Sequence, residues 1–285
     1  MKKRILAVVL AVLTIFAFTG CSTNFLKDSQ LLKDVKNPVV TFVLEYQSER
    51  HSNEERRVTF EYELQYYKAP STVANFIQLV NKDYYKDKIL NAVSTGTVSS
   101  AEVQYVGGAS YSRQSGGLYK RDTLNYTIKG EFKANGWVDA DNKSKNDLKH
   151  EAGSLVMNRS FGADKAFDTA FTEFYIALND SNARQDNFAV FGVLLRSKYE
   201  FKENGVWKSL SALGNTDTDG FADGLFSEFV NDMLGVSKEY RDTTVDKSQI
   251  YVPINDVKIT SMTANTFGTN FTKAKVAKTL NKLNS

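Results

Sequence analysis

Residues Val58 to Tyr66 alternate without a break between apolar and polar side chains. The apolar set is Val58, Phe60, Tyr62, Leu64 and Tyr66, and the polar set between them is Thr59, Glu61, Glu63 and Gln65. Successive side chains of a β-strand point to opposite faces, so this period of two predicts an antiparallel strand with one buried face. Val39 to Tyr46 is the predicted partner strand, and the charged segment Ser48 to Arg57 is the predicted solvated loop between them. Strands of this kind suit several closed β-barrels.

The N-terminal segment has the pattern of a targeting signal. Lys2, Lys3 and Arg4 precede an apolar run from Ile5 to Phe18, which is too short to span a bilayer stably but suits the core of a signal peptide. The run ends at Phe18-Thr19-Gly20-Cys21, which resembles a lipobox. We predict that Cys21 is diacylated and becomes the mature N-terminus. An ordinary secretory signal followed by a chance cysteine is the alternative.

Cys21 is the single cysteine among 285 residues, so the mature chain has neither a disulfide nor a cysteine metal site. The fold must therefore be held by its apolar core, and a chain of this length with 42% hydrophobic residues can bury a large one.

The mature chain carries no net charge. The sequence has 36 Lys and Arg against 33 Asp and Glu, and three of the basic residues lie in the signal segment. The remaining balance of 33 against 33 leaves no basic field, which argues against a nucleic-acid partner. Contact with a membrane is expected through the lipid.

Three further segments carry clear local signals. Pro70 suits the first turn of a helix, and the hydroxyl of Ser71 is the predicted cap. Asn204-Gly205 predicts a type I′ turn in a hairpin from Tyr199 to Leu210. An apolar stripe between Phe221 and Leu234 predicts a second helix. The apolar face of the first helix is Val73, Phe76, Ile77 and Val80.

Two segments close the chain. Val257 to Met262 is the predicted last strand of the barrel. The tail that follows is predicted to form a short basic amphipathic helix, if it folds, with the apolar residues Val276, Leu280 and Leu283 and the basic residues Lys273, Lys275, Lys278 and Lys282.

Several motifs, in order along the chain, resemble those of the cyclophilin-type peptidyl-prolyl cis-trans isomerases. They are Thr72-Val73-Ala74-Asn75-Phe76 after Ala69-Pro70, the glycine pairs Gly107-Gly108 and Gly116-Gly117, Ile128-Lys129-Gly130-Glu131-Phe132 with Asn135-Gly136, Lys149 to Met157, Phe167 to Ile176, and Phe188-Ala189-Val190-Phe191-Gly192. The resemblance implies a mainly β fold, namely a closed eight-stranded antiparallel barrel with two capping helices. It divides the chain into a lipoprotein signal peptide (1–20), a tether (21–37), a cyclophilin-like domain (38–264) with an insertion at about 197–220, and a C-terminal tail (265–285).

The catalytic positions implied by the resemblance are altered in this chain. Rotation about a peptide C–N bond meets a barrier of about 18–20 kcal/mol, and a donor near the twisted amide nitrogen lowers it. The family's donor arginine corresponds to Ala92. Its nearby glutamine corresponds to Val106, or to Gln104 if extra residues before Gly107 shift the strand register. An arginine elsewhere, Arg113, Arg121 or Arg159, is the alternative source of a guanidinium.

The substrate-binding positions implied by the resemblance retain an aromatic wall. Tyr175 takes the place of a pocket phenylalanine and Phe188 that of a pocket histidine, while Glu173 replaces a glutamine. The groove floor corresponds to Asn158, Arg159 and Ser160. No cofactor and no metal are implied.

Two other signals favour a structural role. Asn215 to Gly220 resembles the start of a calcium loop, but position twelve is Phe226 where a glutamate is needed, so a polar turn is preferred. His150 matches a family histidine beside the barrel. With His51 in the predicted loop, the two histidines cannot build a metal centre or a hydrolytic triad.

Two functions are compatible with these observations. The first is a lipid-anchored peptidyl-prolyl isomerase that assists protein folding, with activity weakened by Ala92. The alternative is a non-catalytic cyclophilin-like binding module or chaperone. In both, the expected partners are extended or proline-containing segments of envelope or secreted proteins, and the chain is expected to be a monomer. The expected location is the cell envelope, facing the periplasm or exterior. An outer membrane is favoured where one exists, because Ser22 is not the aspartate that retains lipoproteins at an inner membrane.

Overall fold

The computed structural model describes residues 36–98, 101–114, 119–122, 124–160, 166–210, 225–235, 238–240, 250–253, 255–271 and 276–279. All of them belong to one compact unit that begins at Lys36. The predicted signal peptide, Cys21, Gly116-Gly117 and the segment from Asn215 to Gly220 lie outside the described residues.

The described residues form strands, two α-helices and three short 3₁₀ turns. The strands are β1 (Val39–Ser48), β2 (Glu54–Leu64), β3 (Ile89–Leu90), β4 (Ala92–Val98), β5 (Ala101–Gly108), β6 (Tyr111–Arg113), β7 (Tyr119–Arg121), β8 (Tyr126–Ile128), β9 (Leu155–Met157), β10 (Phe174–Ala177), β11 (Val190–Glu203), β12 (Val206–Ser209), β13 (Lys238–Tyr240), β14 (Ile250–Pro253), β15 (Val257–Asn265) and β16 (Val276–Thr279). The helices are α3 (Pro70–Val80) and α4 (Phe226–Gly235), and the 3₁₀ turns are η1 (Glu49–His51), η2 (Lys133–Asn135) and η3 (Asn182–Arg184).

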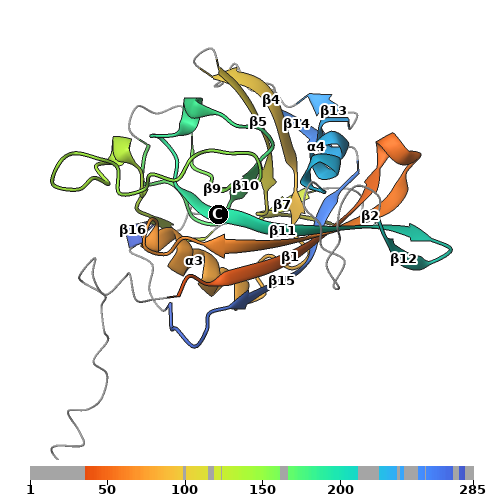
Figure 1. Ribbon diagram of the computed structural model, residues 1–285, viewed down its shortest axis with the longest axis horizontal. Coiled ribbons are helices and arrows are strands. Elements are labelled where there is room, and N and C mark those ends of the chain that lie inside the picture. The colour runs from red at the N-terminus through yellow and green to blue at the C-terminus, as the bar shows by residue number, and fades with distance from the viewer. Residues whose placement is uncertain are drawn as a thin grey trace, which may run out of the picture. The chain divides into compact units, whose positions relative to one another are not determined.

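The antiparallel strands form a circuit that returns to its start. β1 pairs with β2, β2 with β11, β11 with β9, β9 with β10, β10 with β5, and β5 with β4. Only Asn91 separates β4 from β3, and β3 pairs with β15, which pairs again with β1. With β3 and β4 counted as one interrupted strand, the circuit has the eight members of the predicted closed barrel. Figure 1 shows β11, β2, β1 and β15 as adjacent ribbons of this wall.

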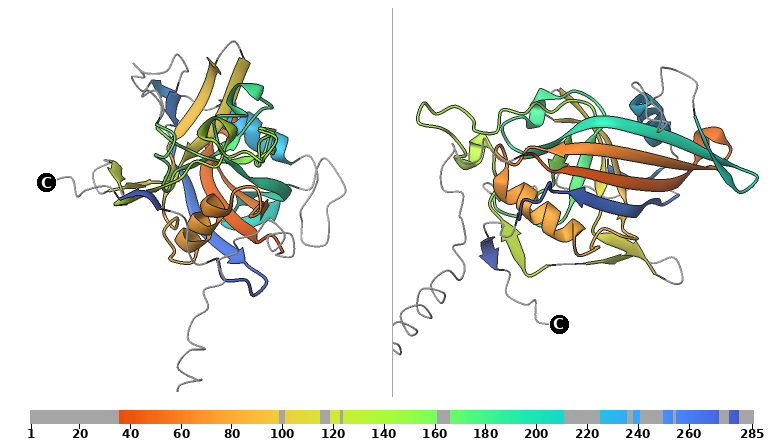
Figure 2. Two further views of the ribbon diagram at one scale, coloured as in Figure 1. Left: turned by 90° about the vertical axis from the view of Figure 1, so that its left-hand side faces the viewer. Right: turned by 60° about the horizontal axis from the view of Figure 1, so that its bottom comes forward.

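The two helices cover different ends of the barrel, as Figures 1 and 2 show. In α3, the ring centroid of Phe76 lies 5.4 Å from that of Phe174 and 5.0 Å from that of Phe191. In α4, the ring of Phe229 lies 5.1 Å from that of Phe60. These contacts bury Phe76 and Phe229 from the two predicted apolar stripes and confirm a mainly β barrel with two helices, while Phe221 lies outside the described residues. Among the described residues, no helix is both long and apolar enough to cross a bilayer.

The cap of α3 differs from the prediction. Ser71 lies inside the first turn, and the residue before the helix is Ala69. The carboxylate of Glu131 caps the helix instead: it accepts hydrogen bonds from the backbone N–H groups of Ser71 (2.8 Å) and Thr72 (2.9 Å). The predicted Ser71 cap was therefore wrong, because a buried carboxylate sixty residues away satisfies the free N–H groups and also complements the positive end of the helix dipole.

The segment between β1 and β2 is more ordered than predicted. The strands run to Ser48 and from Glu54, so only the η1 turn and two following residues remain of the expected loop. Arg56 is 4% exposed, pairs with Glu54 at 2.6 Å, and places its guanidinium 5.6 Å from the ring centroid of Tyr199. Residues Arg50 to Asn53 are exposed, so the middle of the predicted loop is solvated, whereas Arg56 is buried in β2 and packs its charge against an aromatic ring of the neighbouring strand.

The predicted hairpin is confirmed. Asn204 and Gly205 have φ values of 52° and 78°, as a type I′ turn requires, and they join β11 to β12. β11 is continuous through Glu203, so the predicted insertion extends a barrel strand.

The tail contains a strand where a helix was predicted. Val276–Thr279 forms β16, which pairs with β8. The pairing supplies partners for the backbone of a segment too short to be a stable helix by itself.

Candidate active-site groove

β5 and β10 present two apolar faces, one inside the barrel and one outside. On β10, Phe174 packs inward against Phe42 and Phe76, whereas the next residue, Tyr175, packs against Tyr105 and Phe188. The second group belongs to a separate buried cluster, called here the outer aromatic cluster, which consists of Val103, Tyr105, Val156, Tyr175, Phe188 and Val190. The candidate site lies on this outer face.

A cavity of about 190 Å³, called here the groove pocket, opens beside the outer aromatic cluster. Its lining joins residues from β4, β5, β7 and β10 with the segment after β9. The lining residues are Asn91, Ala92, Tyr105, Gly107, Gly108, Tyr111, Arg121, Asn158, Glu173 and Tyr175. Four residues predicted for the site, Ala92, Asn158, Glu173 and Tyr175, therefore meet in one cavity.

Ala92 lies opposite Gly107 in the pairing of β4 with β5. A Cβ atom added at Gly107 would lie 2.6 Å from the Cβ of Tyr175 and 2.9 Å from the carbonyl oxygen of Phe174. Only glycine fits this close approach of β10. Ala92 and Gly107 therefore contribute a methyl group and a glycine to the lining of the groove pocket.

Glu173 is the polar centre of the groove pocket. Its Oε1 accepts hydrogen bonds from Nη2 of Arg121 (2.8 Å), Nε of Arg121 (3.1 Å) and the hydroxyl of Ser110, and its Oε2 accepts one from Nδ2 of Asn158 (3.2 Å). Of the three arginines considered as substitutes, Arg121 is the one that lines this pocket. Arg113 instead pairs with Asp256 through Nε (2.6 Å) and Nη2 (2.8 Å).

Val106 and Gln104, the two β5 residues considered for the position of the family's glutamine, do not line the groove pocket. Val106 is fully buried and pairs with Ile176, so its side chain lies on the interior face. Gln104 lies two residues earlier on the same side of the strand. Its side-chain amide N–H donates a hydrogen bond to the carboxylate of Glu102. The β5 residues that face the groove are Tyr105 and Gly107.

The outer aromatic cluster surrounds the guanidinium of Arg184, which comes from η3. Arg184 is 1% exposed, and its guanidinium carbon lies 4.9 Å from the ring centroid of Tyr105, 4.9 Å from that of Phe188 and 5.5 Å from that of Tyr175. These distances are in the range of cation–π contacts.

The remaining groove-floor residues lie on the other side of Phe188. The guanidinium carbon of Arg159 is 4.7 Å from the ring centroid of Phe188, and its Nε donates to the carbonyl oxygen of Asn187 at 2.8 Å. Ser160 is exposed, and its backbone N–H donates to the hydroxyl of Thr169. Arg159, Ser160 and Phe188 are therefore next to the groove pocket and outside its lining.

His150 supports the aromatic wall from behind. Its Nε2 lies 2.8 Å from the hydroxyl of Tyr175, and the residue is 2% exposed. Burial, together with the positive charge of Arg184, lowers the pKa of His150 to about 4, while burial raises the pKa of Tyr175 to about 12. Both groups are therefore neutral at pH 7, and His150 positions Tyr175.

Sequence reasoning missed Arg184, Tyr105 and Ser110. Arg184 lies in a polar stretch, Asn179 to Asn187, where a charged residue is ordinarily solvated, so its burial had no local signal. Tyr105 could have been found from its place in β5, since it is two residues before Gly107 and shares its face.

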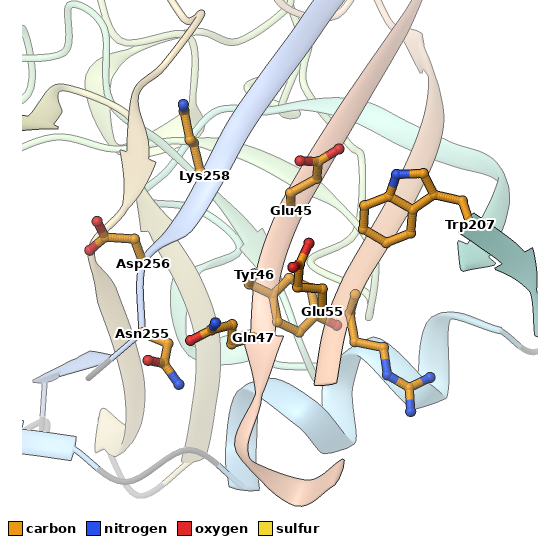
Figure 3. A pocket seen from close by; sticks show the side chains of 9 residues that line it. Glu45, Tyr46, Gln47, Glu55, Trp207, Asn255, Asp256 and Lys258 are labelled. Carbon is orange, nitrogen blue, oxygen red and sulfur yellow. The ribbon is translucent and has the colours of Figure 1, made fainter. Parts of the chain in front are cut away.

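A larger cavity, of about 300 Å³, lies where β1, β2, β12 and β15 meet (Figure 3). Charged residues in its lining already have partners: Glu45 pairs with Arg57, Glu55 with Lys202, and Lys258 with Asp87. Its lining is a mixed polar surface, and the lining residues form no arrangement suited to catalysis. In the described part of the chain, no group of three or more His, Cys, Asp or Glu side chains is placed to hold a metal ion.

The family to which the chain belongs follows from comparison with known proteins. The family model described as "Cyclophilin type peptidyl-prolyl cis-trans isomerase/CLD" matches residues 51–202, just over half of the sequence. Among solved structures, a cyclophilin type peptidyl-prolyl cis-trans isomerase of Cryptosporidium parvum is similar at 16% identity, over 81% of this chain and 98% of that one, with a TM-score of 0.42. The same protein in the presence of the dipeptide Ala-Pro gives 16% identity, 76% and 98% coverage, and a TM-score of 0.36. The curated proteins contain no match. The family match spans all the residues that line the groove pocket, and the chain belongs to the cyclophilin-type peptidyl-prolyl cis-trans isomerase family.

Proposed function

We propose that this chain is a lipid-anchored peptidyl-prolyl isomerase of the cell envelope whose turnover is weak. The observation that carries the proposal is the groove pocket, where Ala92 lies beside Glu173, Asn158 and Tyr175. The pocket retains an aromatic wall and polar groups, while the strand position expected to supply the donor arginine carries a methyl group.

The groove has the parts needed to hold an extended peptide. Asn158 donates to Glu173 through its amide, and its side-chain oxygen can accept from a peptide N–H. Arg121 donates two N–H groups to Glu173, and a guanidinium carries five, so donors remain for a peptide carbonyl. Tyr175 and Tyr105 line the same pocket and give it an aromatic side.

The same geometry accounts for slow turnover. Rotation about the proline bond is fastest when a donor is already oriented toward the amide nitrogen in the transition state. Arg121 already donates through Nε and Nη2 to Glu173, so it is less free to turn toward the amide nitrogen than an arginine at position 92 would be. The loss of one preorganised donor costs on the order of 10²–10³-fold in rate in other enzymes.

The test introduces an arginine at position 92, where the family's donor is expected. In a protease-coupled proline-isomerisation assay on the soluble domain, Ala92→Arg should raise kcat/KM at least tenfold, since the aromatic wall is in place. Ala92→Met, which adds similar bulk without a donor, is the matched control and should not raise it. A folded Ala92→Arg protein with an unchanged rate would contradict the proposal that the groove is a weakened active site.

The membrane part of the proposal is supported by the signal-like segment and the lipobox-like sequence that ends at Cys21. The clients would then be extended or proline-containing segments of envelope or secreted proteins. An outer-membrane position is favoured by Ser22, where that membrane exists.

A non-catalytic binding module is the second candidate, and the buried Arg184 favours it. A guanidinium among Tyr105, Tyr175 and Phe188 takes up apolar surface that a proline ring would need. Exchange spectroscopy on a bound proline peptide separates the two candidates. Cis–trans exchange accelerated by the protein indicates an enzyme, whereas binding with unchanged exchange indicates a module.

A further inference from the structure

Arg184 is placed in the outer aromatic cluster by a loop with several fixed points. The backbone N–H of Ser181 donates to the carbonyl oxygen of His150 at 2.9 Å, and that of Asn187 donates to the carbonyl oxygen of Arg184 at 3.0 Å. Gln185 bonds the neighbouring segment twice: its side-chain oxygen accepts from the N–H of His150 at 3.0 Å, and its amide donates to the carbonyl oxygen of Leu148. The residues on both sides of Arg184 are therefore held, and its side chain enters the cluster from a defined direction.

The position of Arg184 separates the groove into a filled part and an open part. The open part is the groove pocket, to which Tyr105 and Tyr175 contribute. The filled part lies between the same two tyrosines and Phe188, where Arg184 is 1% exposed. Tyr105 and Tyr175 thus have the open pocket on one side and the guanidinium on the other.

We propose that Arg184 is a resident occupant of the proline slot, and that it must be displaced before a proline ring can enter between Tyr175 and Phe188. This inference rests on the proposed function, because it takes the groove to be a peptide site, and it identifies the residue that sets ligand specificity there. In the resting protein an extended peptide binds the groove pocket through its backbone and polar groups. A proline residue adds little to the affinity of the peptide, because Arg184 occupies the slot that the proline ring would fill.

A guanidinium suits this role for a physical reason. It is planar and delocalised and is more weakly hydrated than an ammonium group, so it can stack on aromatic rings at a moderate desolvation cost. Three rings surround it in this protein, and the guanidinium carbon of Arg159 lies 4.7 Å from the ring centroid of Phe188. Burial and the like charge of Arg184 lower the pKa of Arg159.

The experiment measures proline preference in four proteins. A proline-containing tetrapeptide and the same peptide with alanine in place of proline are titrated by calorimetry into the wild type, Arg184→Ala, Arg184→Met and Arg113→Ala. Arg184→Ala empties the slot, Arg184→Met keeps most of the volume without the charge, and Arg113→Ala removes an exposed arginine outside the groove pocket. The isomerisation rate of each protein is measured in parallel.

The expected result is a gain specific to proline. Arg184→Ala should bind the proline peptide at least tenfold more tightly than the wild type does, with less than a threefold change for the alanine peptide. Arg184→Met and Arg113→Ala should show less than a threefold change for both peptides. Burial is the larger cause of the low pKa of His150 and the charge of Arg184 the smaller one, so this pKa, followed by NMR, should rise only slightly from about 4 in both Arg184 variants. A pKa that stays well below 6.5 in both variants shows that His150 is still buried and that the fold around the slot persists.

The outcomes separate this inference from the function on which it rests. Wild-type turnover without a gain in Arg184→Ala would overturn the resident-occupant proposal and leave the isomerase function standing. A gain in Arg184→Ala without any wild-type turnover would support the occupant and contradict weak catalysis. No proline preference in any variant, together with no wild-type turnover, would overturn both. An equal gain in Arg184→Met would show that charge, and not volume, closes the slot, which also contradicts the proposal.

Discussion

Acidification should destabilise the barrel through one buried histidine. His150 is 2% exposed and bonded to Tyr175, and its pKa is about 4 in the folded protein against 6.5 for an unperturbed histidine. The unfolded chain therefore takes up a proton first as the pH falls. The stability associated with neutral His150 is fully present above pH 6.5 and is lost progressively as the pH approaches 4.

The size of the effect follows from the shift. A displacement of one pKa unit corresponds to about 1.4 kcal/mol, so the full difference is about 3 kcal/mol, of which about 2 kcal/mol is lost by pH 5. The comparison is the free energy of unfolding in urea at pH 7.5 and pH 5.0 for the wild type and for His150→Gln. The variant should lose about 2 kcal/mol less than the wild type over this interval.

The other histidine provides the matched control. His51 lies near Asp232, and its side chain is 37% exposed, so His51→Gln should not reduce the loss at pH 5.0. If the wild type and His150→Gln lost stability equally, His150 would be protonated in the folded protein, and its placement behind Tyr175 would be wrong.

Two further predictions concern the helix cap and the anchor. Glu131→Gln should cost about 2 kcal/mol in urea unfolding, because the amide presents N–H groups to the helix terminus where a carboxylate accepted two hydrogen bonds; the exposed Glu151→Gln should be neutral, and an equal effect would refute the capping role. Cys21→Ala should remove fatty-acid labelling and move the protein from the membrane fraction to the soluble fraction, and labelling that persists in the variant would refute lipidation at this position.

The parts of the fold that could be predicted from sequence are those set by local patterns. The alternation from Val58 to Tyr66 predicted β2, and Asn204-Gly205 predicted the turn between β11 and β12 because both residues tolerate positive φ. The barrel topology came from the family resemblance, and the strand circuit agrees with it.

The parts that could not be predicted depend on contacts between distant segments. Ser71 has a suitable side chain for a cap, but Glu131 reaches the same N–H groups through the tertiary fold. The polar segment around Arg184 gave no sign that its charge would be buried among three rings contributed by β5, β10 and the turn before β11. In the groove, sequence reasoning correctly predicted that Ala92, Asn158, Glu173 and Tyr175 belong to one site. It did not predict which β5 side chains face that site.

The closure of the barrel has a consequence for the order of folding. β1 pairs with β2 on one side and with β15 on the other, so Val39 lies opposite Asn265. During synthesis β1 cannot complete its pairing until β15 has been made. Until then the β1–β2 hairpin has one edge with unpaired backbone groups. The side chains of Val40, Phe42 and Leu44 also lack the neighbours that bury them in the finished barrel. Pairings between such distant segments are slow because the loop-closure entropy is spent before the contact forms. The newly made chain is therefore itself a slow-folding, aggregation-prone client until β15 arrives.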